Sequence, residues 1–168
     1  MPWTSQYHDC MNLDQAIFDR TYLHVIQKLQ PFNGRFCIIR SYSTLVAKSW
    51  NESLDFVFID ARHTYDSVVS DILDWMPHVR VGGLICGHDY LHSHFPEVSK
   101  AVHDVFDELG WSVCSEGEYV WSAQKQAEVN AAEMKSRLLS SSVRRSIWWR
   151  TQQSRVASRL RLLRPQWR

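Results

Sequence analysis

The sequence predicts an α/β fold, with a mostly parallel sheet that ends in an antiparallel hairpin and is followed by a basic helical tail. Short apolar runs alternate with amphipathic helical patterns at the spacing of βαβ units. These runs are nearly continuous in apolar residues, which is typical of parallel strands covered on both faces. The chain has 168 residues, of which 45% are hydrophobic, so it is long enough for one ordinary domain with a sizeable core.

The first third of the chain predicts two helices and one strand. Residues 12–29 carry apolar side chains at helical spacing, with Asn12 in the N-cap position and Pro31 just beyond the end. The β-branched run at 35–41, RFCIIRS, predicts a buried strand. Residues 43–50 predict a short helix.

The middle of the chain predicts the core of the sheet. Two apolar strands, 54–60 and 81–90, are separated by a helical pattern over 65–79. A further helix over 96–110 has a proline at its start and a glycine at its end, as helices often do. Residues 111–123 predict two short strands that form a terminal hairpin.

The composition divides the chain into residues 1–123 and a basic extension, 124–168. From Lys125 onward there are eleven Lys or Arg and two Glu, although the formal net charge of the whole chain is only +1. Arginine and tryptophan together would suit a membrane surface or a phosphate-rich partner. We favour the alternative that the apolar side chains of the extension pack and the arginines are solvated. No nucleic-acid-binding motif is present in the sequence.

The cysteines and the apolar runs indicate a reduced, cytoplasmic protein. Cys10, Cys37, Cys86 and Cys114 are widely spaced and form no CxxC pair. No apolar run approaches the roughly 18 residues that cross a bilayer. The N-terminus lacks the charged and apolar regions of a secretory signal.

Ionisable side chains follow the two most apolar strands. Asp60 comes directly after one strand, and His88 and Asp89 end the other. Because the carboxyl ends of neighbouring parallel strands meet at one edge of a sheet, we expect these residues to converge. Asp60, His88 and Asp89 could then hold Mg²⁺ with positions left for a substrate. His63 could remove a proton from a metal-bound hydroxyl.

A structural interpretation of the same residues stays open. Asp60 could cap the helix that follows it, and His63 could simply pack or be solvated. Asp89 could form a turn before Tyr90, with His88 as a hydrogen-bonded histidine. Spacing alone does not decide between these interpretations and a metal site.

One long segment resembles a known family. The pattern FIDARHTYDSVVSDILDWMPHVRVGGLICGHDY, with PEVSKAVHDVF after it, is similar to the C-terminal half of class I S-adenosylmethionine-dependent methyltransferases. The branch is that of small-molecule and sugar O-methyltransferases of the macrocin type. The resemblance covers roughly residues 36–121, with a weaker match before residue 30. It implies a Rossmann-like methyltransferase sheet, S-adenosyl-L-methionine as cofactor and a small-molecule acceptor.

The resemblance also implies roles for individual residues. The metal-dependent members hold Mg²⁺ with an Asp after the fourth strand and an acidic pair after the fifth, and these positions fall on Asp60 and on His88 with Asp89. His88 stands where many members have an acid. The base of the family falls on His63. The cofactor-binding positions fall on Asp60 and, near the adenine, on the two residues Tyr42 and Ser43.

The sequence departs from the family at its beginning. Members start with a strand, a glycine-rich turn of the G-x-G type and a helix, and none of these is found here; Gly34 is the only glycine before residue 82. We therefore expect an incomplete sheet that lacks the glycine-rich cofactor motif, as in an N-terminally truncated member. Its unpaired edges would favour a homo-oligomer. The alternative function is a non-catalytic remnant that acts as an interaction module through its basic tail.

Overall fold

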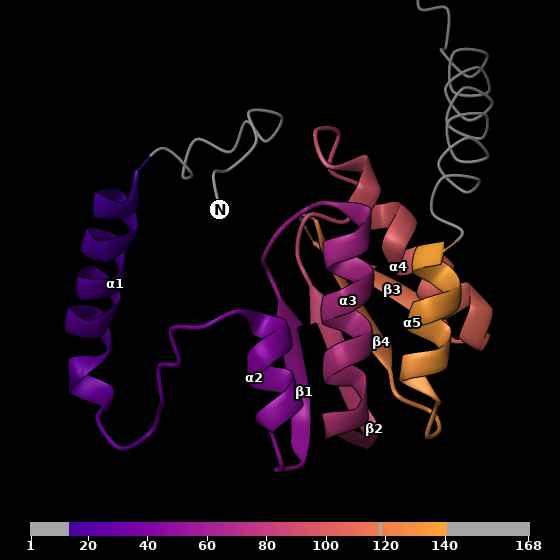
Figure 1. Ribbon diagram of the computed structural model, residues 1–168, viewed down its shortest axis with the longest axis horizontal. Helices are drawn as coiled ribbons and strands as arrows, with labels where there is room; N and C mark the ends of the chain where they lie inside the picture. Colours follow the sequence, from indigo (N-terminus) through magenta and orange to yellow (C-terminus); the bar gives the residue numbers. More distant parts are fainter. Residues whose placement is uncertain (1–13, 118, 141–168) are drawn as a thin grey trace, which may run out of the picture. The chain divides into compact units, whose positions relative to one another are not determined.

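The computed structural model describes residues 14–117 and 119–140, which form two units (Figure 1). The first unit runs to Arg40 and contains α1 (Gln15–Leu29) and the short 3-10 helix η1 (Gln30–Phe32). Asp14 caps α1 by accepting a hydrogen bond from the amide of Ala16 at 3.1 Å. The predicted cap, Asn12, lies outside the described residues. The helix itself is confirmed.

The predicted strand at residues 35–41 is wrong. These residues carry no strand assignment, and none of the ladders between described strands includes them. A strand exists only where a neighbouring backbone supplies its hydrogen bonds, and β-branched composition alone does not provide that neighbour. Cys37 and Ile39, which the pattern placed in a buried strand, are exposed.

The second unit, which begins at Ser41, is built on a four-stranded sheet in the order β1-β2-β4-β3. β1 pairs with β2 in parallel, and β2 and β3 pair with β4 in antiparallel fashion. The α/β class and the terminal hairpin are thereby confirmed. The strands are β1 (Leu54–Ile59), β2 (Val79–Gly87), β3 (Val113–Glu116) and β4 (Val120–Gln124).

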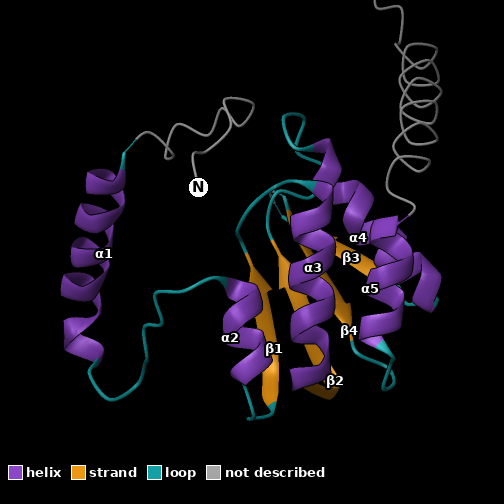
Figure 2. Ribbon diagram, viewed as in Figure 1, coloured by secondary structure: helices purple, strands orange, loops and turns teal. Residues whose placement is uncertain are grey.

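Helices cover one face of this sheet (Figure 2). α3 lies at the centre of the helical layer and packs against α2, α4 and α5. Apolar side chains of α3, α4 and α5 form a single core cluster with inward-facing residues of the strands, such as Ile85 and Trp121. The helices are α2 (Ser43–Ser49), α3 (Tyr65–Trp75), the 3-10 helix η2 (Met76–His78), α4 (Pro96–Leu109) and α5 (Ala131–Ser140).

Proline and glycine set two of the helix ends. α3 gives way to η2 at Met76, one residue before Pro77, because a proline cannot donate the next helical hydrogen bond. α4 ends at Gly110, whose φ of +68° is the left-handed conformation of a C-cap. Part of the predicted basic extension, α5, packs against α3. Residues 141–168 of that extension lie outside the described residues.

The opposite face of β1 and β2 carries exposed apolar side chains. Phe56, Phe58 and Leu84 are 62%, 49% and 44% exposed. The parallel register pairs Phe56 with Leu84, so they share this face. β1 is also the edge strand of the sheet. None of the described helices is long and apolar enough to span a membrane.

Candidate active site

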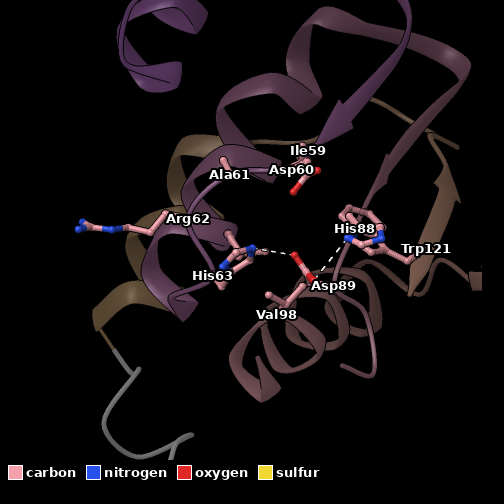
Figure 3. A pocket seen from close by; sticks show the side chains of 10 residues that line it. Ile59, Asp60, Ala61, Arg62, His63, His88, Asp89, Val98 and Trp121 are labelled. Atoms are coloured by element: carbon pink, nitrogen blue, oxygen red, sulfur yellow. Dashed lines mark ion pairs between the residues drawn. The ribbon is translucent and has the colours of Figure 1, made fainter. Parts of the chain in front are cut away.

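The parallel register of β1 and β2 brings the predicted site residues to one edge of the sheet. Ile59, the last residue of β1, pairs with Gly87, the last residue of β2. Asp60 and the pair His88–Asp89 follow directly, so they emerge side by side (Figure 3). Gly87 permits this close approach, because a Cβ there would lie 2.4 Å from the carbonyl oxygen of Ile59.

His63 and Asp89 form the tightest polar contact of the site. The His63 Nε2 lies 2.7 Å from the Asp89 Oδ2, and the two side chains are only 15% and 11% exposed (Figure 3). When the imidazole is neutral and its Nε2–H donates to the carboxylate, the ring lone pair is on Nδ1. This is the arrangement of a base whose orientation a carboxylate fixes.

Asp60 completes a group of three potential metal ligands. One ligand atom each from Asp60, His63 and Asp89 lies within 4.8 Å of the others. These residues line a pocket with a cavity volume of about 10 Å³, which is room for about one water molecule or one ion. Two carboxylates and an imidazole are a donor set that suits a divalent cation. Asp60 and Asp89 thus offer carboxylate oxygens, the donors that such an ion takes, and both line this pocket.

His88 occupies a different place from His63. Its Nδ1 lies 3.4 Å from the Asp89 Oδ1, on the other side of that carboxylate from His63 (Figure 3). The side chain lines the pocket and is 38% exposed. The close group of three contains His63 in its place. The structure thus brings Asp60, His63 and Asp89 together more tightly than the predicted set of Asp60, His88 and Asp89.

The predicted cofactor residues Tyr42 and Ser43 lie at the start of α2. Tyr42 is the N-cap residue and is 73% exposed. The Ser43 hydroxyl accepts a hydrogen bond from the Trp75 indole at 2.7 Å and bonds to the Asp71 carboxyl group. Neither residue is among those that line the pocket beside Asp60. Burial raises the pKa of Asp71, and the Ser43 hydrogen bond partly offsets that rise.

Sequence reasoning missed the residues that support the site. The ring of Phe95 stacks on the His63 imidazole with centroids 4.0 Å apart. Trp121, from β4, also lines the pocket, and its ring lies next to Gly87. Asp89 has a φ of +61°, a backbone conformation that non-glycine residues rarely adopt. No spacing rule identifies the Phe95 and Trp121 contacts, because each joins segments that are distant in the sequence.

Open α/β proteins bind ligands beyond the carboxyl ends of their strands, and the acid–imidazole cluster lies at such an edge. Comparison with known families then gives the particular class. Residues 5–90, just over half of the chain, match a family model described as a methyltransferase domain. The chain therefore belongs to this methyltransferase family, which confirms the resemblance inferred from the sequence.

A solved structure gives an independent view of the fold. The structure of the O-methyltransferase NovP matches with a TM-score of 0.53 and 14% sequence identity. The match covers 76% of this chain and 56% of NovP, so the chain spans a little over half the length of that protein. At this level of identity the likeness shows a shared fold.

Proposed function

We propose that this protein transfers the methyl group of S-adenosyl-L-methionine to a hydroxyl group of a small-molecule or sugar acceptor. The observation that carries the proposal is the hydrogen-bonded pair of His63 and Asp89 beside Asp60, at the ligand-binding edge of a methyltransferase-family sheet. The NovP fold, that of an O-methyltransferase, is consistent with oxygen as the acceptor atom.

His63 would act as the general base. In direct displacement the acceptor oxygen forms a bond to the methyl carbon while the bond from that carbon to sulfur breaks, and the hydroxyl proton has to leave. The Asp89 carboxylate holds the Nε2 side of the imidazole, so Nδ1 would accept this proton. Phe95 restricts rotation of the ring by stacking on it. The pair thus presents a base in one fixed orientation.

Asp60 and Asp89 would hold a divalent cation, with Mg²⁺ the ion that the family implies. The proposed ligand set is Asp60, His88 and Asp89, and the cavity beside them has room for one ion. When bound, such an ion lowers the pKa of a coordinated hydroxyl group.

We assign cofactor binding to Asp60, Tyr42 and Ser43 on the basis of the family resemblance. Tyr42 offers an exposed ring next to Ser43, which is fixed by Trp75. We further propose a cytoplasmic protein that forms a homo-oligomer. Contact of the basic tail with a membrane surface is not favoured.

Calorimetric titration with S-adenosyl-L-methionine, with and without Mg²⁺, tests the proposal directly. Methyl transfer would be followed as formation of S-adenosylhomocysteine with methyl glycosides and phenols as acceptors. Asp60→Asn should abolish metal-dependent turnover and leave the circular dichroism spectrum unchanged. Asp55→Asn is the matched control, because Asp55 lies on β1, the strand that leads to Asp60, is exposed and pairs with another exposed residue, Arg80.

The second candidate function is a non-catalytic interaction module. The exposed apolar face that contains Phe56, Phe58 and Leu84 favours it, because such faces often mark contacts with other proteins. The same titration separates the two functions. A folded, monodisperse sample that binds no S-adenosyl-L-methionine would exclude the enzymatic function for this chain and favour the interaction module.

A further inference from the structure

α4 and its N-cap residue contact the segments that carry both members of the His63–Asp89 pair. α4 begins at Pro96, directly after the loop that carries Asp89, and packs along α3, which begins just after His63. Its side chains therefore lie next to both segments. The contacts fall into two sets, one toward His63 and one toward Asp89.

Three contacts fix the His63 side. The Phe95 ring stacks on the imidazole. The Glu97 Oε2 accepts a hydrogen bond at 2.9 Å from the backbone amide of Tyr65, two residues after His63. The Tyr65 hydroxyl donates to the Asp104 Oδ2 at 2.8 Å. The start of α3 is thereby tied to α4 through both its backbone and a side chain.

Two side chains one turn apart on α4 fix the Asp89 side. The Ser99 Oγ accepts a hydrogen bond at 2.7 Å from the amide of Leu91, and the His103 Nε2 lies 2.9 Å from the Tyr90 hydroxyl. Ser99 and Tyr90 are almost fully buried. Residues four apart share one face of a helix, so these contacts hold consecutive residues of the loop against one surface.

The loop that these contacts hold is conformationally strained. Asp89 and Leu91 have φ values of +61° and +60°, in the left-handed region that disfavours side chains. Such conformations persist only where the surrounding contacts over-determine them. The Tyr90 amide also donates to the Tyr119 carbonyl oxygen at 2.9 Å. With the Ser99 and His103 contacts, this bond fixes Tyr90 and Leu91, the two residues that follow Asp89.

We propose that α4 works as a clamp in which Ser99 and His103 are positioning residues for Asp89, while Phe95 and Glu97 position His63. Ser99, His103 and Glu97 act through residues next to the pair, and Phe95 acts on the imidazole by stacking. They set the 2.7 Å contact between His63 and Asp89, and with it the tautomer and orientation of the imidazole. The inference rests on the proposed function for its kinetic consequence, but the geometry of the pair can be tested without turnover.

The clamp predicts a spectroscopic effect of variants that lie outside the pocket. In protein labelled with ¹⁵N-histidine, the Nε2–H of His63 should give a downfield, exchange-protected proton signal because it donates to a shielded carboxylate. Ser99→Ala and His103→Ala should broaden or abolish this signal. They should also lower kcat about tenfold, as loss of supporting contacts typically does, with KM for the acceptor little changed.

Two further variants separate positioning from general stability. His103→Gln keeps a group that can bond to the Tyr90 hydroxyl, so it should restore most of the signal and of kcat. Ser49→Ala makes the same chemical change as Ser99→Ala at an exposed site at the end of α2, where the hydroxyl bonds to carbonyl groups of its own helix. It should behave like the parent protein. His103→Ala serves if Ser99→Ala fails to fold, because the His103 side chain is 38% exposed.

The outcomes distinguish failure of the clamp from failure of the proposed function. Folded Ser99→Ala and His103→Ala proteins with an unchanged His63 signal would overturn the clamp, whether or not the parent protein is active. Absence of the protected signal from the folded parent protein would overturn it as well. Loss of the signal in the variants of a parent protein without turnover would support the clamp and contradict the proposed function.

Discussion

Asp89 has two features that are seldom found in one residue: a left-handed backbone and a shielded carboxylate that bonds to an imidazole. The backbone conformation has an energetic cost of about 1 kcal/mol or more, and the fold tolerates it because the conformation aims the carboxylate at His63. The role of Asp89 is therefore better tested by changing its charge than by changing its shape.

Asp89→Asn should lower kcat by about 10²-fold or more, while the protein stays folded. The amide is the same size as the carboxylate, but it no longer carries the charge that stabilises a protonated His63, and it can hold the ring in the wrong tautomer. Stopped-time assays of S-adenosylhomocysteine formation would measure the effect. Activity within twofold of the parent protein would show that His63 is not oriented through this carboxylate.

Asp71 offers a prediction about stability and pH. Burial raises its pKa above the ordinary value of 3.8, so the folded protein binds this proton more tightly than the unfolded chain does. At neutral pH the buried charge is thus destabilising, and this penalty disappears as the pH falls through the raised pKa and below the ordinary one. Asp71→Asn should increase the free energy of unfolding at neutral pH, and the gain should shrink in acid.

Urea titrations near neutral pH and near the ordinary pKa of an aspartate would test this sign. Asp74→Asn is a useful control on the same helix, because its carboxylate bonds to the Lys135 ammonium group at 2.7 Å. Its loss should destabilise at neutral pH. An Asp71→Asn protein that is less stable than the parent protein at neutral pH would show that the Ser43 hydrogen bond to the carboxylate outweighs the cost of burying it.

At the scale of single residues, the sequence predicted which side chains meet at the sheet edge but not how they pair. Asp60, His63 and Asp89 could be found because each follows the end of an apolar strand, and the register of parallel strands is set by burial. Whether His63 or His88 joins the two acids depends on loop conformation, in particular the φ of Asp89. The two residues after Asp89 are held by Ser99, His103 and Tyr119, which no local pattern connects with the loop.

At the scale of secondary structure, Gly87 allows β2 to lie close to both β1 and the ring of Trp121. A Cβ at this position would lie 2.9 Å from the Trp121 ring, besides its clash with the Ile59 carbonyl oxygen. Neither neighbour can move, because one is backbone and the other is a ring buried in the core. Gly87→Ala should therefore lower the free energy of unfolding by about 3 kcal/mol.

Gly110→Ala is the control for that substitution. A Cβ at Gly110 would meet nothing within 4 Å, so only its φ of +68° opposes the change, at a cost of about 1 kcal/mol. Thermal or urea unfolding would compare the two variants. Equal destabilisation would mean that the strands separate to accommodate the methyl group, and that the tight edge of the sheet is not rigid.

The helices were more predictable than the strands for a physical reason. Helical hydrogen bonds are local, so apolar periodicity and end signals such as Pro96 and Gly110 largely define α4. A strand needs a partner, which the sequence does not name. The predicted strands pair with each other at 54–60 and 81–90. Residues 35–41 pair with none of the described strands.

At the scale of the whole molecule, the sheet of the second unit has one covered face and one face with exposed phenylalanines. Soluble proteins usually limit such faces and protect the edges of their sheets with charges or proline. Here the edge strand β1 carries Phe56 and Phe58 outward, with Leu84 beside them on β2. This arrangement supports the proposed homo-oligomer.

Charged substitutions on this face should weaken self-association. Phe56→Lys combined with Phe58→Lys places two ammonium groups on the edge strand, where burial against a second copy would require their desolvation. We expect the dissociation constant of the oligomer to rise at least about tenfold, as for a loss of about 1.4 kcal/mol. Sedimentation velocity over a wide range of protein concentration would measure the change in this constant.

Leu45→Lys is the matched control, because Leu45 is similarly exposed, at 53%, but lies on α2 in the helical layer. A parent protein that stays monomeric at all concentrations, or an equal effect of both sets of substitutions, would contradict association through this face.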